Sequence, residues 1–197
     1  MATLFVDKID PQSGTSLEIG SSGDTITIPS GATITNNGTQ TGFGGTNTPA
    51  FQANLSASQN LGGNNTWTKV AFNEESFDTN SDYDNSSNYR FTPTVSGKYM
   101  IYAHCQLSAT AVDRNGISEI AIYKNNSSIA QSIIDPRQAS SEGGHRFTCT
   151  INLVVEPNGS GDYYEIFARC FDNSGATGTL HYDNDGSNVF GAYKIIE

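Results

Sequence analysis

From Ala50 to the C-terminus, short runs of alternating apolar and polar residues are separated by Asn, Gly, Asp and Pro. This period of two is typical of β-strands joined by turns, and no helical periodicity of useful length accompanies it. We therefore predict an all-β sandwich or barrel over residues 50–197. The expected strands are Phe51–Leu55, Trp67–Phe72, Tyr89–Phe91, Tyr99–Leu107, Ser118–Tyr123, Ser128–Ile134, Arg146–Val155, Tyr163–Phe171 and Val189–Ile196.

The strand expected at Tyr99–Leu107 is apolar on one face and partly aromatic on the other. Tyr99, Ile101, Ala103, Cys105 and Leu107 share one face, and Met100, Tyr102, His104 and Gln106 share the other. Because successive strand side chains point to opposite sides, such a sheet needs cover on both sides. A sandwich core would cover one face, and a subunit interface would cover the other.

The N-terminal part of the chain shows a different pattern. Three short alternating segments, Ser16–Ile19, Thr25–Ile28 and Ala32–Thr35, are separated by turn residues and carry one or two apolar side chains each. Strands this short cannot build a core in one chain, so stacking on other copies would have to supply partners. We predict a β-rich stem over residues 1–40 and a linker over residues 41–49; the alternative is a flexible Ser/Thr/Gly tail.

Composition and charge narrow the function classes. The chain has 197 residues, a formal net charge of −10, 36% hydrophobic residues and 15% charged residues. The negative charge argues against binding to nucleic acid or to an anionic membrane surface. We expect no signal peptide, because no basic, apolar leader is present, and no apolar run is long enough to cross a bilayer. The three cysteines lack metal or disulfide spacing, so we expect buried free thiols.

Between Phe72 and Tyr99 the chain resembles the C1q-like branch of the C1q/tumour-necrosis-factor superfamily. The family phrase begins Phe-Asn and continues through Tyr-Asp to a Pro-Gly-Tyr ending; its Thr-Gly step is replaced around Ser87 and Asn88. The end of the chain, Val189–Tyr193, is similar to the closing strand of that family. The matching positions of the phrase are Phe72, Asn73, Tyr83, Asp84, Phe91, Pro93, Gly97 and Tyr99.

This resemblance covers about residues 50–197 and implies a ten-strand jelly-roll sandwich that forms a homotrimer. Pro93 and Gly97 would bracket a turn, because proline lacks a ladder donor and glycine is free to take a positive φ. The alternation leaves open which face of the Tyr99–Leu107 strand lies in the trimer. The candidate interface residues are Tyr99, Met100, Ile101, Tyr102 and Tyr193.

The first residues, Leu4–Ile9, are similar to the start of tail-fibre-like proteins of marine tailed phages. This second resemblance implies a virion protein, assembled in the host cytoplasm, whose N-terminal segment joins other tail proteins. The head would recognise a glycan or protein on the host surface. The alternative is a structural or accessory fibre whose head only trimerises and caps the stem.

Acidic residues gather in the segment that contains the family phrase. Asp78, Asp82 and Asp84 are spaced so that they could supply calcium ligands, although Tyr83 stands where an EF-hand loop needs glycine. No cofactor is required by this reading, and calcium is an optional ligand. The alternative is a solvated acidic loop in which Tyr83 and Asp84 are structural.

No catalytic motif marks the chain as an enzyme. A nucleophile elbow, an HExxH motif and a phosphate loop are absent, and His104, His145 and His181 are scattered. A glycan hydrolase is the least favoured alternative, because it needs two carboxylates at a separation that a sequence cannot show. For glycan binding, Tyr83, Tyr182 and Asn184 are the candidates. Trp67 is predicted to lie in the core with Val70 and Phe72.

Overall fold

The computed structural model describes residues 8–38, 47–109, 117–135, 146–171, 175, 177–182 and 186–195. The chain divides into two compact units, residues 1–43 and residues 44–197, and each is described by itself. Among the described residues there is no helix, and so none that could span a membrane.

In the first unit, residues 8–38 form turns but no strand. The Asp24 amide donates to the Ser21 carbonyl at 2.9 Å, and the Ala32 amide donates to the Pro29 carbonyl at 3.1 Å. The three strands predicted for this segment are therefore absent from the single chain. Their large apolar side chains are exposed instead, among them Leu17, Ile19, Ile26, Ile28 and Ile34.

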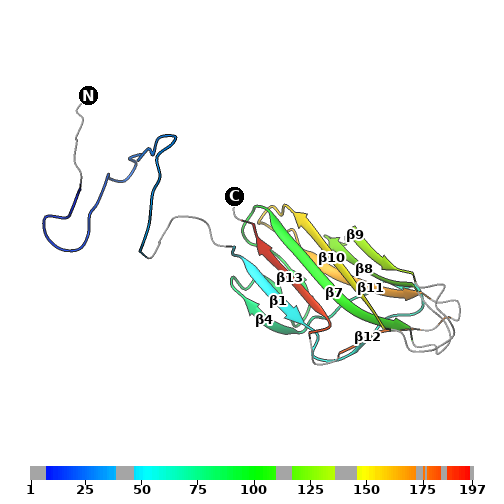
Figure 1. Ribbon diagram of the computed structural model, residues 1–197. Helices are drawn as coiled ribbons and strands as arrows, with labels where there is room; N and C mark the ends of the chain where they lie inside the picture. Colours follow the sequence, from blue (N-terminus) through cyan, green and yellow to red (C-terminus); the bar gives the residue numbers. More distant parts are fainter. Residues whose placement is uncertain are drawn as a thin grey trace. The chain divides into compact units, whose positions relative to one another are not determined.

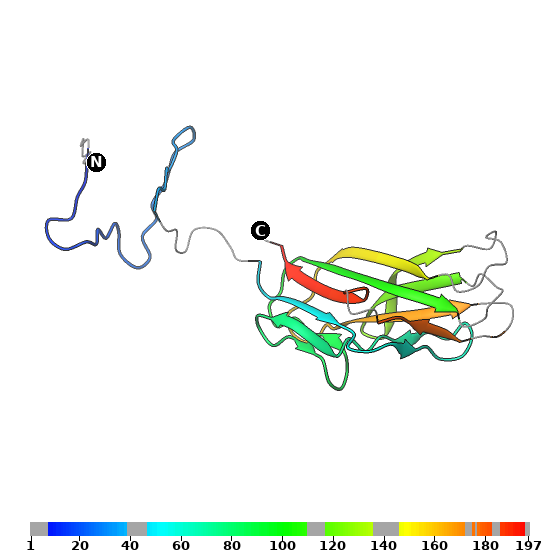
Figure 2. The same ribbon diagram turned by 60° about the horizontal axis from the view of Figure 1, so that its bottom comes forward.

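The second unit is a sandwich of two antiparallel sheets, which Figures 1 and 2 show from two directions. The described residues form thirteen strands, whereas the family resemblance implied ten; four of the thirteen are only two residues long. The strands are β1 (Ala50–Asn54), β2 (Gln59–Asn60), β3 (Thr68–Lys69), β4 (Glu74–Asp78), β5 (Tyr83–Asp84), β6 (Arg90–Phe91), β7 (Tyr99–Ala109), β8 (Ile117–Lys124), β9 (Ser127–Ile134), β10 (Phe147–Val155), β11 (Tyr164–Phe171), β12 (Gly178–Leu180) and β13 (Val189–Lys194).

The long strand β7 organises the first sheet. Strand β10 pairs along one edge of β7, while β13 and then β12 pair along the other edge. Beyond β13 come β1 and β4, and β2 pairs with β12. The second sheet runs β5-β6-β11-β8-β9, with β3 also paired to β11.

The predicted alternation in β7 is confirmed. Tyr99, Ile101 and Cys105 are fully buried between the two sheets, whereas Met100 and Tyr102 are half-buried on the outside. The core beside them is aromatic: the Phe51 ring stacks on those of Tyr83 and Phe91 at centroid distances of 4.5 and 4.6 Å. Rings packed in this way add to the free energy of area burial.

The three cysteines are buried free thiols, as predicted. Cys105 of β7 lies directly opposite Cys149 of β10 in the register of the first sheet. Burial raises the pKa of the Cys149 thiol to about 12, and it raises the pKa of Cys105 as well. Both thiols are therefore protonated and unreactive in the folded protein at neutral pH.

The predicted turn before β7 is also confirmed. Gly97 has a φ of 129°, a conformation that residues with a side chain rarely adopt. The Tyr99 hydroxyl donates to the Val95 carbonyl at 2.8 Å and closes the turn. The turn sets where β7 begins, and so which of its residues face the core.

Candidate functional site

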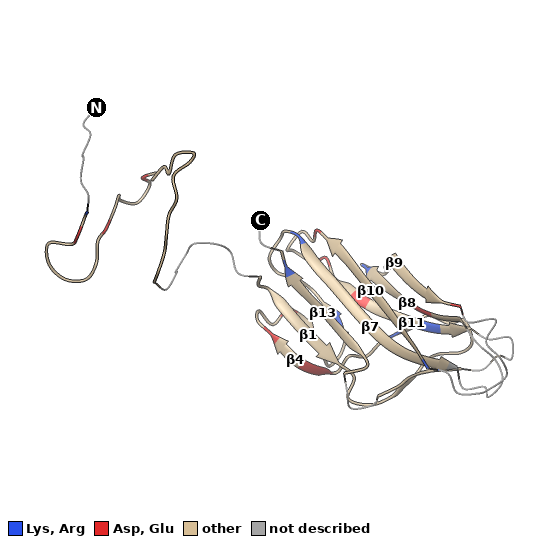
Figure 3. Ribbon diagram, viewed as in Figure 1, with Lys and Arg blue, Asp and Glu red and all other residues tan. Residues whose placement is uncertain are grey.

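The outer face of the first sheet is free of charge across its centre. Strands β1, β7 and β10 contain no Lys, Arg, Asp or Glu, whereas β4 carries three acidic residues (Figure 3). The register aligns outward side chains in rows across these strands. One row joins Val154, Met100, Tyr193 and Ala50, and the next joins Asn152, Tyr102, Gly191, Gln52 and Phe77.

Several apolar side chains in these rows are open to solvent in the single chain. Val154 is 48% exposed, Phe77 is 47% exposed and Tyr193 is 38% exposed. They come from three different strands of one sheet, so they form part of one surface. Exposed apolar groups gathered on an uncharged sheet face are typical of a surface that another protein covers.

The Tyr102 side chain reaches across this face from β7 to β13 and β1. Its hydroxyl donates to Gln52 Oε1 at 3.1 Å, and its ring occupies the space above Gly191 that a Cβ would fill. A side chain at position 191 would also stand 2.9 Å from the Phe51 carbonyl oxygen. Gly191 therefore lets the ring approach the backbone, which keeps the surface level.

The structure corrects two of the predicted interface residues. Tyr99 and Ile101 are fully buried within the sandwich, so neither can contact a second subunit. Met100, Tyr102 and Tyr193 do lie on the outer face. The alternation separated the two faces of β7 correctly, but only the packing of the second sheet shows which one points inward.

The outer face of the second sheet is built differently. Arg169 Nη2 and Glu119 Oε2 are 2.7 Å apart, and the Arg169 guanidinium stacks over the Trp67 ring at 4.4 Å. The neighbouring rings of Tyr123 and Phe167 have centroids 4.2 Å apart. Trp67 is half-buried on this surface, so the prediction that it belongs to the core is wrong.

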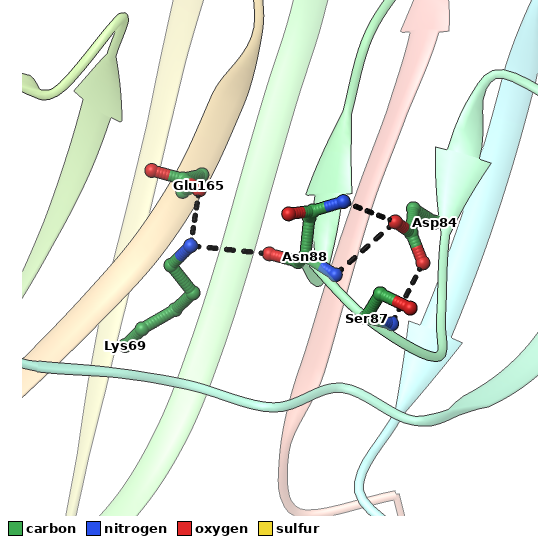
Figure 4. A network of polar contacts seen from close by, with 5 residues as sticks. All are labelled: Lys69, Asp84, Ser87, Asn88 and Glu165. Atoms are coloured by element: carbon green, nitrogen blue, oxygen red, sulfur yellow. Dashed lines mark hydrogen bonds and ion pairs between the residues drawn. The ribbon is translucent and has the colours of Figure 1, made fainter.

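Lys69 and Glu165 form a second ion pair on the same sheet. Lys69 Nζ lies 2.5 Å from Glu165 Oε1 and donates to the Asn88 carbonyl at 3.2 Å (Figure 4). Glu165 is only 2% exposed, and its other oxygen has no hydrogen-bond partner among the described residues. The Lys69 ammonium therefore neutralises a nearly buried carboxylate and holds the β5–β6 loop beside β11.

Asp84 organises that loop from within. Its carboxylate accepts hydrogen bonds from the backbone amides of Ser86, Ser87 and Asn88 at 2.9–3.1 Å, and from the Asn88 side chain at 2.7 Å (Figure 4). Hydrogen bonds to the charged form lower the pKa of Asp84, with the Ser87 amide as the largest cause. Asp84 therefore has a structural role in the loop.

The other two predicted calcium ligands also bond to the backbone. Asp78 accepts from the Asn80 and Tyr83 amides, and Asp82 accepts from the Thr94 amide. Within the described ranges, no three acidic, histidine or cysteine side chains are close enough together to hold a metal ion. The geometry thus gives no support to a calcium site at these aspartates.

Of the two predicted glycan contacts that the structure describes, Tyr182 lies at a cleft and Tyr83 does not. Tyr83 is buried, and its hydroxyl donates to the Phe72 carbonyl at 2.9 Å; burial raises its pKa. Asn184 lies outside the described residues. The cleft by Tyr182 encloses about 280 Å³ and is lined by Asn54, Leu55, Glu74, Glu75, Ser76, Tyr182, Gly186, Ser187 and Asn188.

The sequence analysis did not single out Glu74, Glu75 or Asn188 for binding. The two glutamates form the start of β4, and Asn188 directly precedes β13. Strand β1 pairs with both of these strands, so the ends of β4 and β13 flank it. The only signal in the sequence was the pair of adjacent glutamates after Asn73, and pairing through β1 could not be read from it.

No protein-family model matches this chain, and no curated protein sequence matches it. Solved structures do match it. The globular domain of zebrafish complement 1qA protein is similar over 75% of this chain and 98% of its own length, with a TM-score of 0.51 and 16% identity.

Two further solved structures are similar to about the same extent. Eiger TNF from S. frugiperda matches 74% of this chain and 91% of its own length, with a TM-score of 0.52 and 11% identity. Murine APRIL matches 74% of this chain and 98% of its own length, with a TM-score of 0.51 and 13% identity. At such low identities the likeness concerns the fold alone: the second unit is a jelly-roll sandwich of the C1q and TNF type.

Proposed function

We propose that three copies of this chain associate through the outer face of the first sheet and form the non-enzymatic head of a phage tail fibre. The observation that carries the proposal is the charge-free face over β1, β7 and β10, where Val154 of β10 is exposed and Tyr193 is exposed on β13 between β7 and β1. Fully burying a fully exposed side chain of this size contributes about 1.5–3 kcal/mol, so covering a side chain that is already half-buried contributes about half as much, once in each of the three subunits.

The N-terminal segment supports the fibre part of the proposal. Apolar side chains along residues 8–38 are exposed, with Ile19 at 62% and Ile26 at 60%. The segments that carry these side chains are too short to form a stable sheet in one chain, and two further copies would supply the missing partners. The similarity of Leu4–Ile9 to tail-fibre proteins favours attachment of this segment to the virion, which leaves the head to bind a host-surface ligand.

Light scattering after size-exclusion chromatography tests the proposal, on the full chain and on residues 46–197. We expect both to be trimers. Val154→Asp should dissociate the trimer, because it places a charge in the covered face. Ile133→Asp is the matched control: Ile133 is 57% exposed on β9 of the other sheet, so this variant should stay trimeric.

Each other outcome has a definite meaning. A monomeric full chain would overturn the fibre and leave a monomeric binding sandwich as the better reading. A trimer only in the full chain would assign assembly to the N-terminal segment. Equal effects of the two Asp variants would show that the first sheet is not the interface.

A further inference from the structure

We infer that the cleft beside the end of β1 and the start of β4 binds a sugar with free hydroxyl groups and no negative charge. This inference rests on the proposed function, because it names the ligand that the head would recognise. Its basis is the combination in one cleft of two carboxylates, the Tyr182 side chain and a fixed polar wall.

The charge of the cleft is negative. Glu74 and Glu75 are exposed, and neither makes an ion pair with any residue that the structure describes. Among the described residues that line the cleft there is no Lys, Arg or His. Figure 3 shows the acidic residues gathered on β4, beside strands that carry no charge. Two carboxylates accept strong hydrogen bonds from hydroxyl or ammonium groups, and they repel uronate, sialate or sulfate groups.

The opposite wall is held by a buried amide. Asn188 is 2% exposed; its Oδ1 accepts from the Gln106 amide at 2.9 Å, and its Nδ2 donates to the His181 carbonyl and to Ser187 Oγ. The Gly186 carbonyl lies 2.8 Å from His104 Nε2. These bonds tie the residues beside Tyr182 to β7, so the wall exists before a ligand arrives.

The near wall is fixed by another side-chain bond. Asn54 Nδ2 donates to Ser76 Oγ at 2.7 Å and joins the end of β1 to β4. Leu55 also lines the cleft but is only 3% exposed, so it offers a ligand little apolar surface. A few polar groups around the aromatic Tyr182 match the hydroxyl-bearing edge and the C–H face of a sugar. The volume of about 280 Å³ suits a terminal sugar rather than a long chain.

The position of the cleft suits a ligand presented from outside. Ala50 is the end of β1 at which the chain enters the second unit, whereas Asn54 at the other end of the strand lines the cleft. The cleft is thus at the end of β1 remote from the junction with the proposed stem. A host glycan could reach it while the centre of the sheet is covered.

The test is an oligosaccharide array with neutral, amino and acidic members, probed with the full chain. We expect binding to neutral or amino sugars and none to acidic ones. The Glu74→Gln/Glu75→Gln double variant keeps the shape but removes the charge. It should lose about tenfold or more in affinity, because charge-assisted hydrogen bonds are replaced by weaker neutral ones. Tyr182→Ala should lose binding to a similar degree. Glu156→Gln, an exposed carboxylate outside the cleft, is the matched control and should bind as the wild type does.

The other outcomes separate this inference from the proposed function. If the protein is a trimer that binds no sugar, or binds only acidic sugars, the proposed sugar site is wrong and the proposed fibre is unaffected. If it is a monomer that binds a sugar through Glu74 and Glu75, the proposed fibre is wrong and the proposed sugar site is supported. Binding to polylysine but to no sugar would show that the ligand of the cleft is a cationic protein and not a sugar. Release of reducing ends from a bound glycan would overturn the non-enzymatic reading.

Discussion

The outer faces of the two sheets differ in how their apolar side chains are covered. On the second sheet, Arg169 pairs with Glu119, and Lys69 pairs with Glu165. Aromatic rings fill the space between these pairs. On the first sheet there are no charges over β1, β7 and β10, and exposed apolar side chains remain. The centre of the second sheet is covered by its own charged side chains, although Ile129 and Ile133 stay exposed on its end strand β9. The first sheet leaves Val154 and Tyr193 exposed on or beside strands without charge, and a second molecule would remove this apolar area from water.

This difference indicates which surface feature marks a subunit interface. Aromatic residues alone do not identify it, because the second sheet has Trp67, Tyr123 and Phe167 on its surface. Those rings are packed under or beside a paired cation, and the ion pairs fix their positions. Apolar exposure alone does not identify it either, because Ile129 and Ile133 are exposed on β9 of the second sheet. What distinguishes the first sheet is that the neighbouring strands β7 and β10 both lack charge, whereas β8 beside β9 is charged.

The largest effect on stability should come from a side chain placed under Tyr102 on the first sheet. Gly191→Ala puts a methyl group into the Tyr102 ring and 2.9 Å from the Phe51 carbonyl. Overpacking of this kind should lower the free energy of unfolding by about 3 kcal/mol. Chemical denaturation measures it. Adding Tyr102→Ala should restore part of the loss; no restoration would place the strain at the backbone alone.

The next effect should come from breaking an ion pair of the second sheet. Arg169→Ala leaves the Glu119 carboxylate, 7% exposed, without its partner and uncovers Trp67. We expect a loss of about 2 kcal/mol in unfolding free energy, with the oligomeric state unchanged. Arg169→Ala/Glu119→Ala should be less destabilised than the single variant. A change in oligomeric state would contradict the separate roles of the two faces.

A smaller, pH-dependent effect should appear at the loop held by Lys69. Asp84→Ala removes the acceptor for three backbone amides and should cost about 1 kcal/mol at pH 7. The pKa of Asp84 is lowered in the folded protein, so its contribution is present above the unfolded pKa of about 3.9 and is lost as the pH falls below it. The difference between wild type and variant should therefore shrink from pH 7 to pH 3. A constant difference would show that the charge of Asp84 is not what the loop uses.

The smallest effect should be on the thiols, which lie between the two faces. Because Cys105, Cys149 and Cys170 are buried, a thiol reagent at pH 8 should label none of them in the folded wild type. Val154→Asp and Ile133→Asp should leave this protection intact, since both side chains point outward. Rapid labelling in either variant would mean that the sandwich itself has opened.

Much of the second unit follows from local pattern. Alternation placed Cys105 and Ile101 on one side of β7 and Tyr102 on the other, because the period of a strand is two. The same rule could have placed Trp67. It shares parity with Lys69, whereas Val70 and Phe72 share the opposite parity and are buried. The prediction of a core Trp67 grouped it with Val70 and Phe72 in one alternating strand and did not take this parity into account.

The site depended on contacts that no local pattern contains. Tyr182 and Glu75 are more than one hundred positions apart, and they meet because β4 and β13 both pair with β1. The acidic spacing of Asp78, Asp82 and Asp84 suggested a metal, but a backbone amide donates to an oxygen of each of them; the buried Asp82 Oδ1 has no hydrogen-bond partner among the described residues. A spacing of ligand types cannot show which oxygens the fold itself uses.

The amino-acid sequence by itself determined the all-β class, the two faces of β7, the buried thiols and the turn at Gly97. These are local properties, set by side-chain period and by backbone sterics. Only the tertiary structure decided which face of β7 points inward, which exposed face lacks charge, and that Glu74, Glu75 and Tyr182 line one cleft. Those properties depend on strand pairing between distant segments, and their free energy comes from contacts that exist only after the sheets have packed.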